Sequence, residues 1–286
     1  MLLGSASIDL LRQSGESLAG RIAYVDMGPF NVLEVGADQA KVTSLWVRGG
    51  YPDSYLAADN EGSLALRKDF IRTYLERDVP MFGPRIPAET LERLWTMLAH
   101  SQGTLLNASR LASSLSISAQ TVTRYIDLLV DLLLVRRLQP FHANLNKRLV
   151  KSPKVYVRDS GLLHALLGVP DYNALCGHPV VGASWEGFVL ENLLAVTPSR
   201  THASFYRTAA GAEIDLLLEL PGGELWAIEI KLGSAPKCEK GFHQAREDVQ
   251  PDRSFVVYSG HGRYPITTGI EAINVKELAQ DLAELP

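Results

Sequence analysis

The chain has little cysteine, little net charge and no long apolar run, and each shortage excludes a class of protein. Its two cysteines, Cys176 and Cys238, lie far apart and form no CxxC pair, which excludes a disulfide framework and a cysteine-rich zinc site. A net charge of −4 in 286 residues excludes a uniformly basic nucleic-acid binder. No apolar run approaches the length of a membrane span, and the start MLLGSAS lacks the basic residues of a signal peptide. We therefore expect a cytoplasmic protein without a membrane partner.

A motif for nucleotide binding is also missing. The pattern G-x-x-x-x-G-K-[ST], whose backbone amides and lysine hold the phosphates of ATP, occurs nowhere in the sequence. We expect that the isolated chain neither binds nor hydrolyses ATP. The composition, with 46% apolar and 21% charged residues, nevertheless suits folded domains, and the length suits about two of them.

Residues 205–231, FYRTAAGAEIDLLLELPGGELWAIEIK, predict two strands joined by a tight turn at Pro221–Gly223. The strands are apolar enough for a sheet that is buried on both faces. A three-residue loop at this turn would place Asp215 opposite Glu229. Four charged residues, Glu213, Asp215, Glu229 and Lys231, thus lie within an otherwise apolar hairpin.

Four charged residues of this hairpin form a candidate site. Side chains two apart lie on one face of a strand, so Glu213 lies beside Asp215, and Lys231 lies beside Glu229. Two carboxylates that meet there provide the oxygen ligands that a hard cation such as Mg²⁺ prefers, with a positive neighbour for a reacting phosphate. The alternative is a ribbon whose acids are solvated. Burying these charges in so apolar a hairpin is costly unless they act together, which favours a site.

The segment between residues 101 and 160 has the spacing of apolar residues typical of a helix-turn-helix followed by a wing. It contains nine Lys or Arg against three Asp, a net of +6 that suits a phosphate backbone. The alternative is a winged helix that contacts protein. The predicted helices are Ala88–His100, Ser109–Leu115 and Ala119–Leu134, the last two with Asn107 and Ser118 as candidate N-caps. The predicted wing strands are Val135–Pro140 and Lys154–Val157. The candidate DNA contacts are Gln120, Thr121, Thr123 and Arg124 on the second helix of the motif and Lys147, Arg148 and Lys151 at the wing tip.

A strong helix is predicted at Ala183–Val196, ahead of the charged hairpin. Glu186 lies along its packed side, because it falls three residues before Val189 and seven before Leu193. Glu191 is a weaker alternative for a functional glutamate on this helix. A helix at residues 237–249, a buried strand at 254–258 and a terminal helix at 276–285 follow the hairpin.

Asp215, thirteen residues and then Glu229-x-Lys231 resemble the PD-(D/E)xK nuclease core, or restriction-endonuclease-like fold. The order helix, strand, strand, helix, strand is similar to that core as well. The resemblance implies that Glu186, Asp215 and Glu229 hold Mg²⁺ and that Lys231 stabilises developing charge on a phosphate. The catalytic set would then be Glu186, Asp215, Glu229 and Lys231.

Other parts of the chain resemble a prokaryotic family of AAA-type ATPases that carry a C-terminal domain of unknown function. The resemblance implies that Ser5 occupies the sensor position and that Arg21 lies near the nucleotide phosphates. It also implies that the first half of the ATPase module is absent, so that the chain is an N-terminally truncated member. The matching residues are Gly4–Ser7, Ser17–Arg21, Gly49–Pro52, Tyr74–Asp78 and Lys154–Leu162.

We therefore predict a mixed α/β protein that binds DNA and carries a nuclease-like domain, with Mg²⁺-dependent endonuclease activity left open. The alternative is a catalytically inactive binding or regulatory module that pairs with a separate, intact ATPase; self-association is a further possibility. The predicted domains are an ATPase remnant at 1–44, a helical linker at 45–87, a winged helix-turn-helix at 88–158 and a PD-(D/E)xK nuclease-like domain at 159–286.

Overall fold

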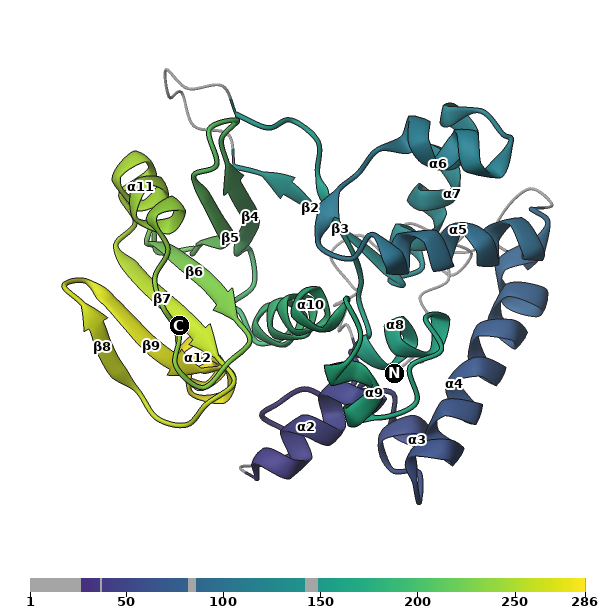
Figure 1. Cartoon of the computed structure of the whole chain (residues 1–286), viewed down its shortest axis with the longest axis horizontal. Coiled ribbons are helices and arrows are strands. Elements are labelled where there is room, and N and C mark those ends of the chain that lie inside the picture. Colours follow the sequence, from purple (N-terminus) through teal and green to yellow (C-terminus); the bar gives the residue numbers. More distant parts are fainter. Residues whose placement is uncertain (1–26, 37, 82–85, 142–148, 286) are drawn as a thin grey trace, which may run out of the picture.

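The computed structural model describes residues 27–36, 38–81, 86–141 and 149–285 (Figure 1). Ser5 and Arg21, and the wing-tip residues Lys147 and Arg148, lie outside the described residues, so the roles expected of them stay predictions. None of the helices within the described ranges is both long and apolar enough to cross a membrane.

Helices dominate the described residues between Asp38 and His100, in agreement with the helical linker predicted at 45–87 and the helix predicted at Ala88–His100. Asp38 caps the first of them by accepting a hydrogen bond from the Ala40 amide, and Asp59 caps the longest one through the Gly62 amide. That helix begins at Asn60, because Asp59 supplies the cap. The elements are α2 (Gln39–Arg48), α3 (Pro52–Tyr55), α4 (Asn60–Thr73), the π turn η1 (Tyr74–Asp78), the 3-10 turn η2 (Val79–Met81) and α5 (Ala88–His100).

The segment predicted as a helix-turn-helix forms two packed helices, α6 (Ala108–Leu115) and α7 (Ala119–Asp131). Asn107 and Ser118 cap them as predicted, by accepting from the amides of Arg110 and Thr121. The prediction that α7 reaches Leu134 is wrong by three residues. Leu133 adopts a left-handed φ of 59°, and the Leu134 amide donates to the Leu129 carbonyl, which ends the helix.

Three short strands accompany α6 and α7: β1 (Thr104–Leu105), β2 (Val135–Pro140) and β3 (Lys154–Val157). β2 and β3 pair antiparallel, and both have the bounds predicted for the wing. We call the strand pair β2 and β3 the β2–β3 segment. It joins the sheet of the C-terminal half, because β2 runs parallel to β4 (His202–Arg207) through the pairs Gln139 with Ser204 and Pro140 with Phe205.

The described residues contain eleven α-helices and one sheet of nine strands in the order β1-β3-β2-β4-β5-β6-β7-β9-β8. The stretch 205–231 contains the end of β4 and two further strands, rather than two strands in all. A turn at Thr208–Ala212 with Gly211 at φ 93° separates β4 from β5. The remaining strands are β5 (Glu213–Glu219), β6 (Leu225–Lys231), β7 (Arg253–Tyr258), β8 (Tyr264–Thr267) and β9 (Ile270–Asn274).

The centre of the sheet is covered on both faces, as the apolar strands predicted. Successive side chains of β5 point to opposite faces of the sheet. Leu216 belongs to the large core on the face covered by α10 (Val181–Leu194). Leu217 packs on the other face with Phe242 of α11 (Lys240–Val249). α12 (Val275–Ala283) lies beside α10. The charged hairpin is therefore held between two layers of helix.

Helices α8 (Ser160–Leu166) and α9 (Tyr172–Cys176) precede α10 and associate with the N-terminal helices. The fully buried His164 of α8 shows how: its Nδ1 donates to the Val47 carbonyl of α2, and its Nε2 accepts from the Ser184 hydroxyl of α10. Trp46 donates to the same hydroxyl oxygen. Residues 160–176 thus pack on the N-terminal helices, although the predicted domain boundaries assign them to the nuclease-like domain at 159–286.

Candidate functional site

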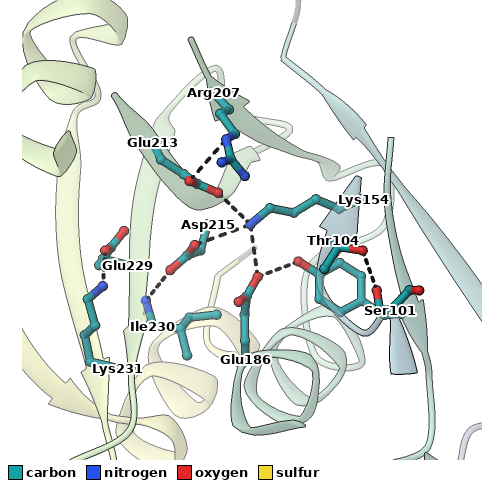
Figure 2. A network of polar contacts seen from close by, with 11 residues as sticks. Ser101, Thr104, Lys154, Glu186, Arg207, Glu213, Asp215, Glu229, Ile230 and Lys231 are labelled. Atoms are coloured by element: carbon teal, nitrogen blue, oxygen red, sulfur yellow. Dashed lines mark hydrogen bonds and ion pairs between the residues drawn. The ribbon is translucent and has the colours of Figure 1, made fainter. Parts of the chain in front are cut away.

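The side-chain ammonium of Lys154 lies at the centre of the candidate site (Figure 2). Its Nζ is 2.9 Å from Oε1 of Glu213, 3.1 Å from Oε1 of Glu186 and 3.5 Å from Oδ1 of Asp215. The lysine side chain is 3% exposed. Lys154 is the first residue of β3, so a cation from the β2–β3 segment occupies the point on which carboxylates of α10 and β5 converge.

Local structure explains why these side chains meet. Glu213 and Asp215 share one face of β5, as predicted, while Ile214 between them faces the α11 core. Glu186 approaches from α10, as predicted. Tyr156, two residues after Lys154 and on the same face of β3, donates its hydroxyl to Oε1 of Glu186 over 2.6 Å.

The electrostatics of the cluster favour a charged lysine. Burial by itself lowers the pKa of the Lys154 ammonium, but the charges of Glu186, Asp215 and Glu213 raise that pKa above its ordinary value. Burial, and then the charge of Asp215, raise the pKa of Glu186. The ammonium is therefore retained at neutral pH, and the acids depend on it for compensation.

Glu229 and Lys231 form a second pair beside this cluster. Lys231 Nζ lies 2.8 Å from Oε1 of Glu229 and 3.4 Å from Oε1 of Glu239. Asp215 links the two groups, because its Oδ2 accepts the Ile230 amide over 2.9 Å. Leu216 pairs with Ile228, and this register continues to place Asp215 beside Glu229, in agreement with the predicted turn.

The carboxyl group of Glu229 is buried, and none of the described residues donates a hydrogen bond to its Oε2. Burial, followed by the charge of Asp215, raises the pKa of Glu229 to about 8. Lys231 opposes this rise but does not cancel it. Glu229 therefore holds a proton at neutral pH in this arrangement.

The arrangement does not fit a divalent cation while Lys154 is in place. The carboxylate oxygens surround an ammonium at 2.9–3.5 Å, whereas Mg²⁺ requires oxygens at about 2.0–2.1 Å and would bring its charge to the same point. Across the described part of the chain, no three His, Cys, Asp or Glu side chains are grouped so that they could hold a metal. Binding of Mg²⁺ by Glu186, Asp215 and Glu229 stays a prediction.

In the sequence Lys154 counts only as one basic residue of the wing, and no local pattern places it in the site. A usable signal was present: all four residues of β3, Lys-Val-Tyr-Val, are buried, and a lysine inside so apolar a strand needs a carboxylate partner. The partner could not be named, because Glu186 and Asp215 are 32 and 61 positions away along the chain.

Glu191, the alternative functional glutamate of α10, has a different role. Its carboxylate binds the guanidinium groups of Arg136 and Arg158, with 2.8 Å between Oε2 and Arg136 Nη2 and 2.9 Å between Oε2 and Arg158 Nε. Burial raises the pKa of Glu191, but the two arginines hold it below its ordinary value. This ion pair fixes the β2–β3 segment on α10 independently of Lys154.

Most of the candidate DNA-contact residues that the structure describes are exposed, and their binding of DNA stays a prediction. Gln120, Thr123 and Arg124 of α7 are exposed, as is Lys151, whereas Thr121 is half-buried and bonded to Ser118. Much of the local positive charge, however, is neutralised by carboxylates: Arg136 and Arg158 bind Glu191, Arg137 binds Asp127, and Lys154 binds the acidic cluster. Less positive charge is available to bind phosphates than the net charge of +6 for residues 101–160 indicates.

Comparison with known proteins divides the chain close to the start of α10. Residues 39–173 match the family model of a domain of unknown function, DUF8612. Residues 181–278 match DUF4143. DUF4143 is likewise a domain of unknown function and is often found with AAA ATPases. The DUF4143 region supplies all the acids of the site, whereas Lys154 comes from the DUF8612 region, so the site forms where the two regions meet.

Two uncharacterised mycobacterial proteins, from Mycobacterium bovis and Mycobacterium tuberculosis, are each 45% identical to the chain over 279 residues. The match covers 97% of this chain but 62% of each relative, so the chain spans about three fifths of the length of these proteins. No solved structure matches the chain.

Proposed function

We propose that the chain is a DNA-binding protein whose α6–α7 pair contacts the duplex and whose nuclease-like α/β domain serves as a binding or regulatory scaffold. The exposed face of α7 carries this proposal. Val122, Ile126 and Leu129 pack α7 against the protein, while Gln120, Thr123 and Arg124 point away from that contact. A second helix with an apolar inner face and a polar, basic outer face is what major-groove readers use.

The acidic cluster favours a scaffold over a constitutive nuclease. The charge of Lys154 already neutralises the carboxylates that cleavage would need for a metal ion. The frequent occurrence of DUF4143 with AAA ATPases supports an ATPase as protein partner of such a scaffold. A Mg²⁺-dependent endonuclease is the second candidate, favoured by the convergence of Glu186, Glu213 and Asp215 on one point.

Fluorescence anisotropy with labelled 30-base-pair duplexes tests the DNA-binding proposal. Arg124→Ala should weaken binding and reduce the slope of log affinity against log salt by about one, because one phosphate contact is lost. Arg72→Ala is the matched control, since Arg72 is also an exposed arginine on a helix but lies on α4 and pairs with Glu76. Equal affinities for the two variants across the salt series would remove α7 from the interface.

A further inference from the structure

A cleft of about 320 Å³ lies at the carboxyl ends of β7 and β9, and we call it the β7–β9 cleft. Tyr258 ends β7 and pairs with Asn274, the last residue of β9, and both residues line the cleft. Gln39 and Val42 of α2 line it from the DUF8612 region, and Trp185 of α10 lines it from the DUF4143 region. The carboxyl ends of parallel strands are where open α/β sheets bind ligands. The cleft is separate from the candidate site, because none of the acids around Lys154 lines it.

The loop that follows β7, residues 259–262, forms one wall of the cleft and is fixed against the ring of Tyr258. The Tyr258 hydroxyl donates to the carbonyls of His261 and Gly262, the latter over 3.2 Å. Gly260 packs on the same ring, where an added Cβ would lie 2.3 Å from a ring carbon. Gly262 has a φ of 92°, a left-handed conformation that favours glycine. This wall is therefore formed before any ligand arrives, which lowers the entropic cost of binding.

Hydrogen-bond donors without a partner gather in this cleft. The Asn274 side chain caps only the Glu277 amide, so the amides of Val275 and Lys276 have no acceptor within α12. The Lys276 ammonium forms no ion pair with any described residue. The indole N–H of Trp185, a residue that is 2% exposed, likewise has no acceptor in the described part of the chain. Glu277 supplies the one carboxylate among the described residues of the cleft, and it already accepts from the Asn274 side-chain amide.

We propose that the β7–β9 cleft binds a small organic phosphate, whose phosphoryl group lies at the start of α12 and whose organic part packs on Val42 and the ring of Trp185. A helix start attracts negative charge, and its amides donate to phosphate oxygens. The ammonium of Lys276 and the indole N–H supply further donors, and a phosphate has more oxygens to accept them than a carboxylate has. The volume exceeds what the phosphoryl group alone would fill and suits a small organic molecule. Such a ligand would touch α2 and α12 and would link the two regions of the chain.

Isothermal titration calorimetry of the full chain with phenyl phosphate as probe tests the proposal. Inorganic phosphate and phenol are the comparison probes, because each keeps one half of phenyl phosphate. We expect phenyl phosphate to bind more tightly than inorganic phosphate, and phenol to give no heat of binding. Equal affinities for phenyl phosphate and inorganic phosphate would overturn the assignment to an organic phosphate. No binding of phenyl phosphate would overturn the site itself.

Two variants test whether the probe lies in the cleft. Lys276→Met should weaken phenyl phosphate binding roughly tenfold, because a hydrogen bond between two charged groups is lost. Trp185→Phe keeps an aromatic ring but removes the indole N–H, and it should weaken binding roughly fivefold. Trp95→Phe is the matched control: the indole N–H of Trp95 is also buried and has no acceptor among the described residues, but Trp95 lies on α5, outside the cleft.

Wild-type affinity in Lys276→Met, or equal effects of Trp185→Phe and Trp95→Phe, would overturn the proposal. Lys276 is half-buried at the surface, so its variant should fold and decides the test if Trp185→Phe does not. The proposal does not depend on DNA binding by α7, and Arg124→Ala should bind phenyl phosphate as wild type does while it loses affinity for DNA. A loss of phenyl phosphate binding in Arg124→Ala would place the probe on α7 and would overturn the proposal.

Discussion

The buried carboxyl of Glu229 predicts an unusual dependence of stability on pH. In the folded state its pKa is raised from 4.5 to about 8, first by burial and then by the charge of Asp215. In the unfolded chain the same group titrates near its ordinary value. Glu229→Gln replaces it with a side chain of similar shape that cannot ionise, and Lys231 keeps Glu239 as a partner at 3.4 Å.

The sign and size of the effect follow from proton linkage. Below pH 4.5 the group holds a proton in both states and contributes nothing. Between pH 4.5 and 8 the folded state alone holds the proton, so each unit of rising pH lowers the free energy of unfolding by about 1.4 kcal/mol. Over the whole interval the loss amounts to roughly 5 kcal/mol, and it persists above pH 8. The variant lacks this loss, so its stability relative to wild type should increase as the pH rises.

Urea denaturation of both proteins at pH 5, 7 and 8.5 measures the difference. His164 contributes the opposite slope, because burial lowers its pKa to about 4 and stability then rises with pH from about 4 to 6.5. His164 is present in both proteins, so its contribution cancels in the difference. A difference that stays constant from pH 5 to 8.5 would refute the reasoning and would mean that Lys231 keeps Glu229 ionised with an ordinary pKa.

Two further variants test the packing around the site. Glu191→Gln should lower the free energy of unfolding by roughly 3–5 kcal/mol in urea denaturation, because it leaves two half-buried arginines without a carboxylate; a loss below about 1 kcal/mol would contradict this. Gly161→Ala should destabilise the protein by roughly 1–3 kcal/mol, since the added Cβ would lie 2.1 Å from the Arg48 carbonyl oxygen. Gly182→Ala, whose Cβ would meet nothing within 4 Å, is the control, and equal melting temperatures for the two alanine variants would count against a close contact of α8 with α2.

Local physics made several elements predictable from the sequence. Asn107 and Ser118 identified the starts of α6 and α7, because a short polar side chain satisfies free amides at a helix start whatever the tertiary context. The turn at Pro221–Gly223 set the register that brings Asp215 beside Glu229. The apolar strands of the hairpin correctly indicated a sheet covered on both faces.

Other features depended on tertiary contacts that no local pattern encodes. The end of α7 was misplaced because Leu132–Leu134 are apolar enough to continue a helix, and the left-handed Leu133 follows from the path of the chain into β2. The parallel pairing of β2 with β4 joins residues about 65 positions apart. Glu191 is the weaker alternative to Glu186 in the sequence, and only the position of the arginines assigns Glu191 to an ion pair.

The sequence by itself determined that carboxylates would gather at the ends of β5 and β6, because alternation along a strand and a short turn fix which side chains share a face. It did not determine what compensates their charge. Any cation of the chain, or a metal ion, would satisfy the same pattern of acids, and the choice depends on which segment the fold carries to that point. In the tertiary structure Lys154 compensates the charge of these acids, because the pairing of β2 with β4 brings the start of β3 next to the acids of α10 and β5.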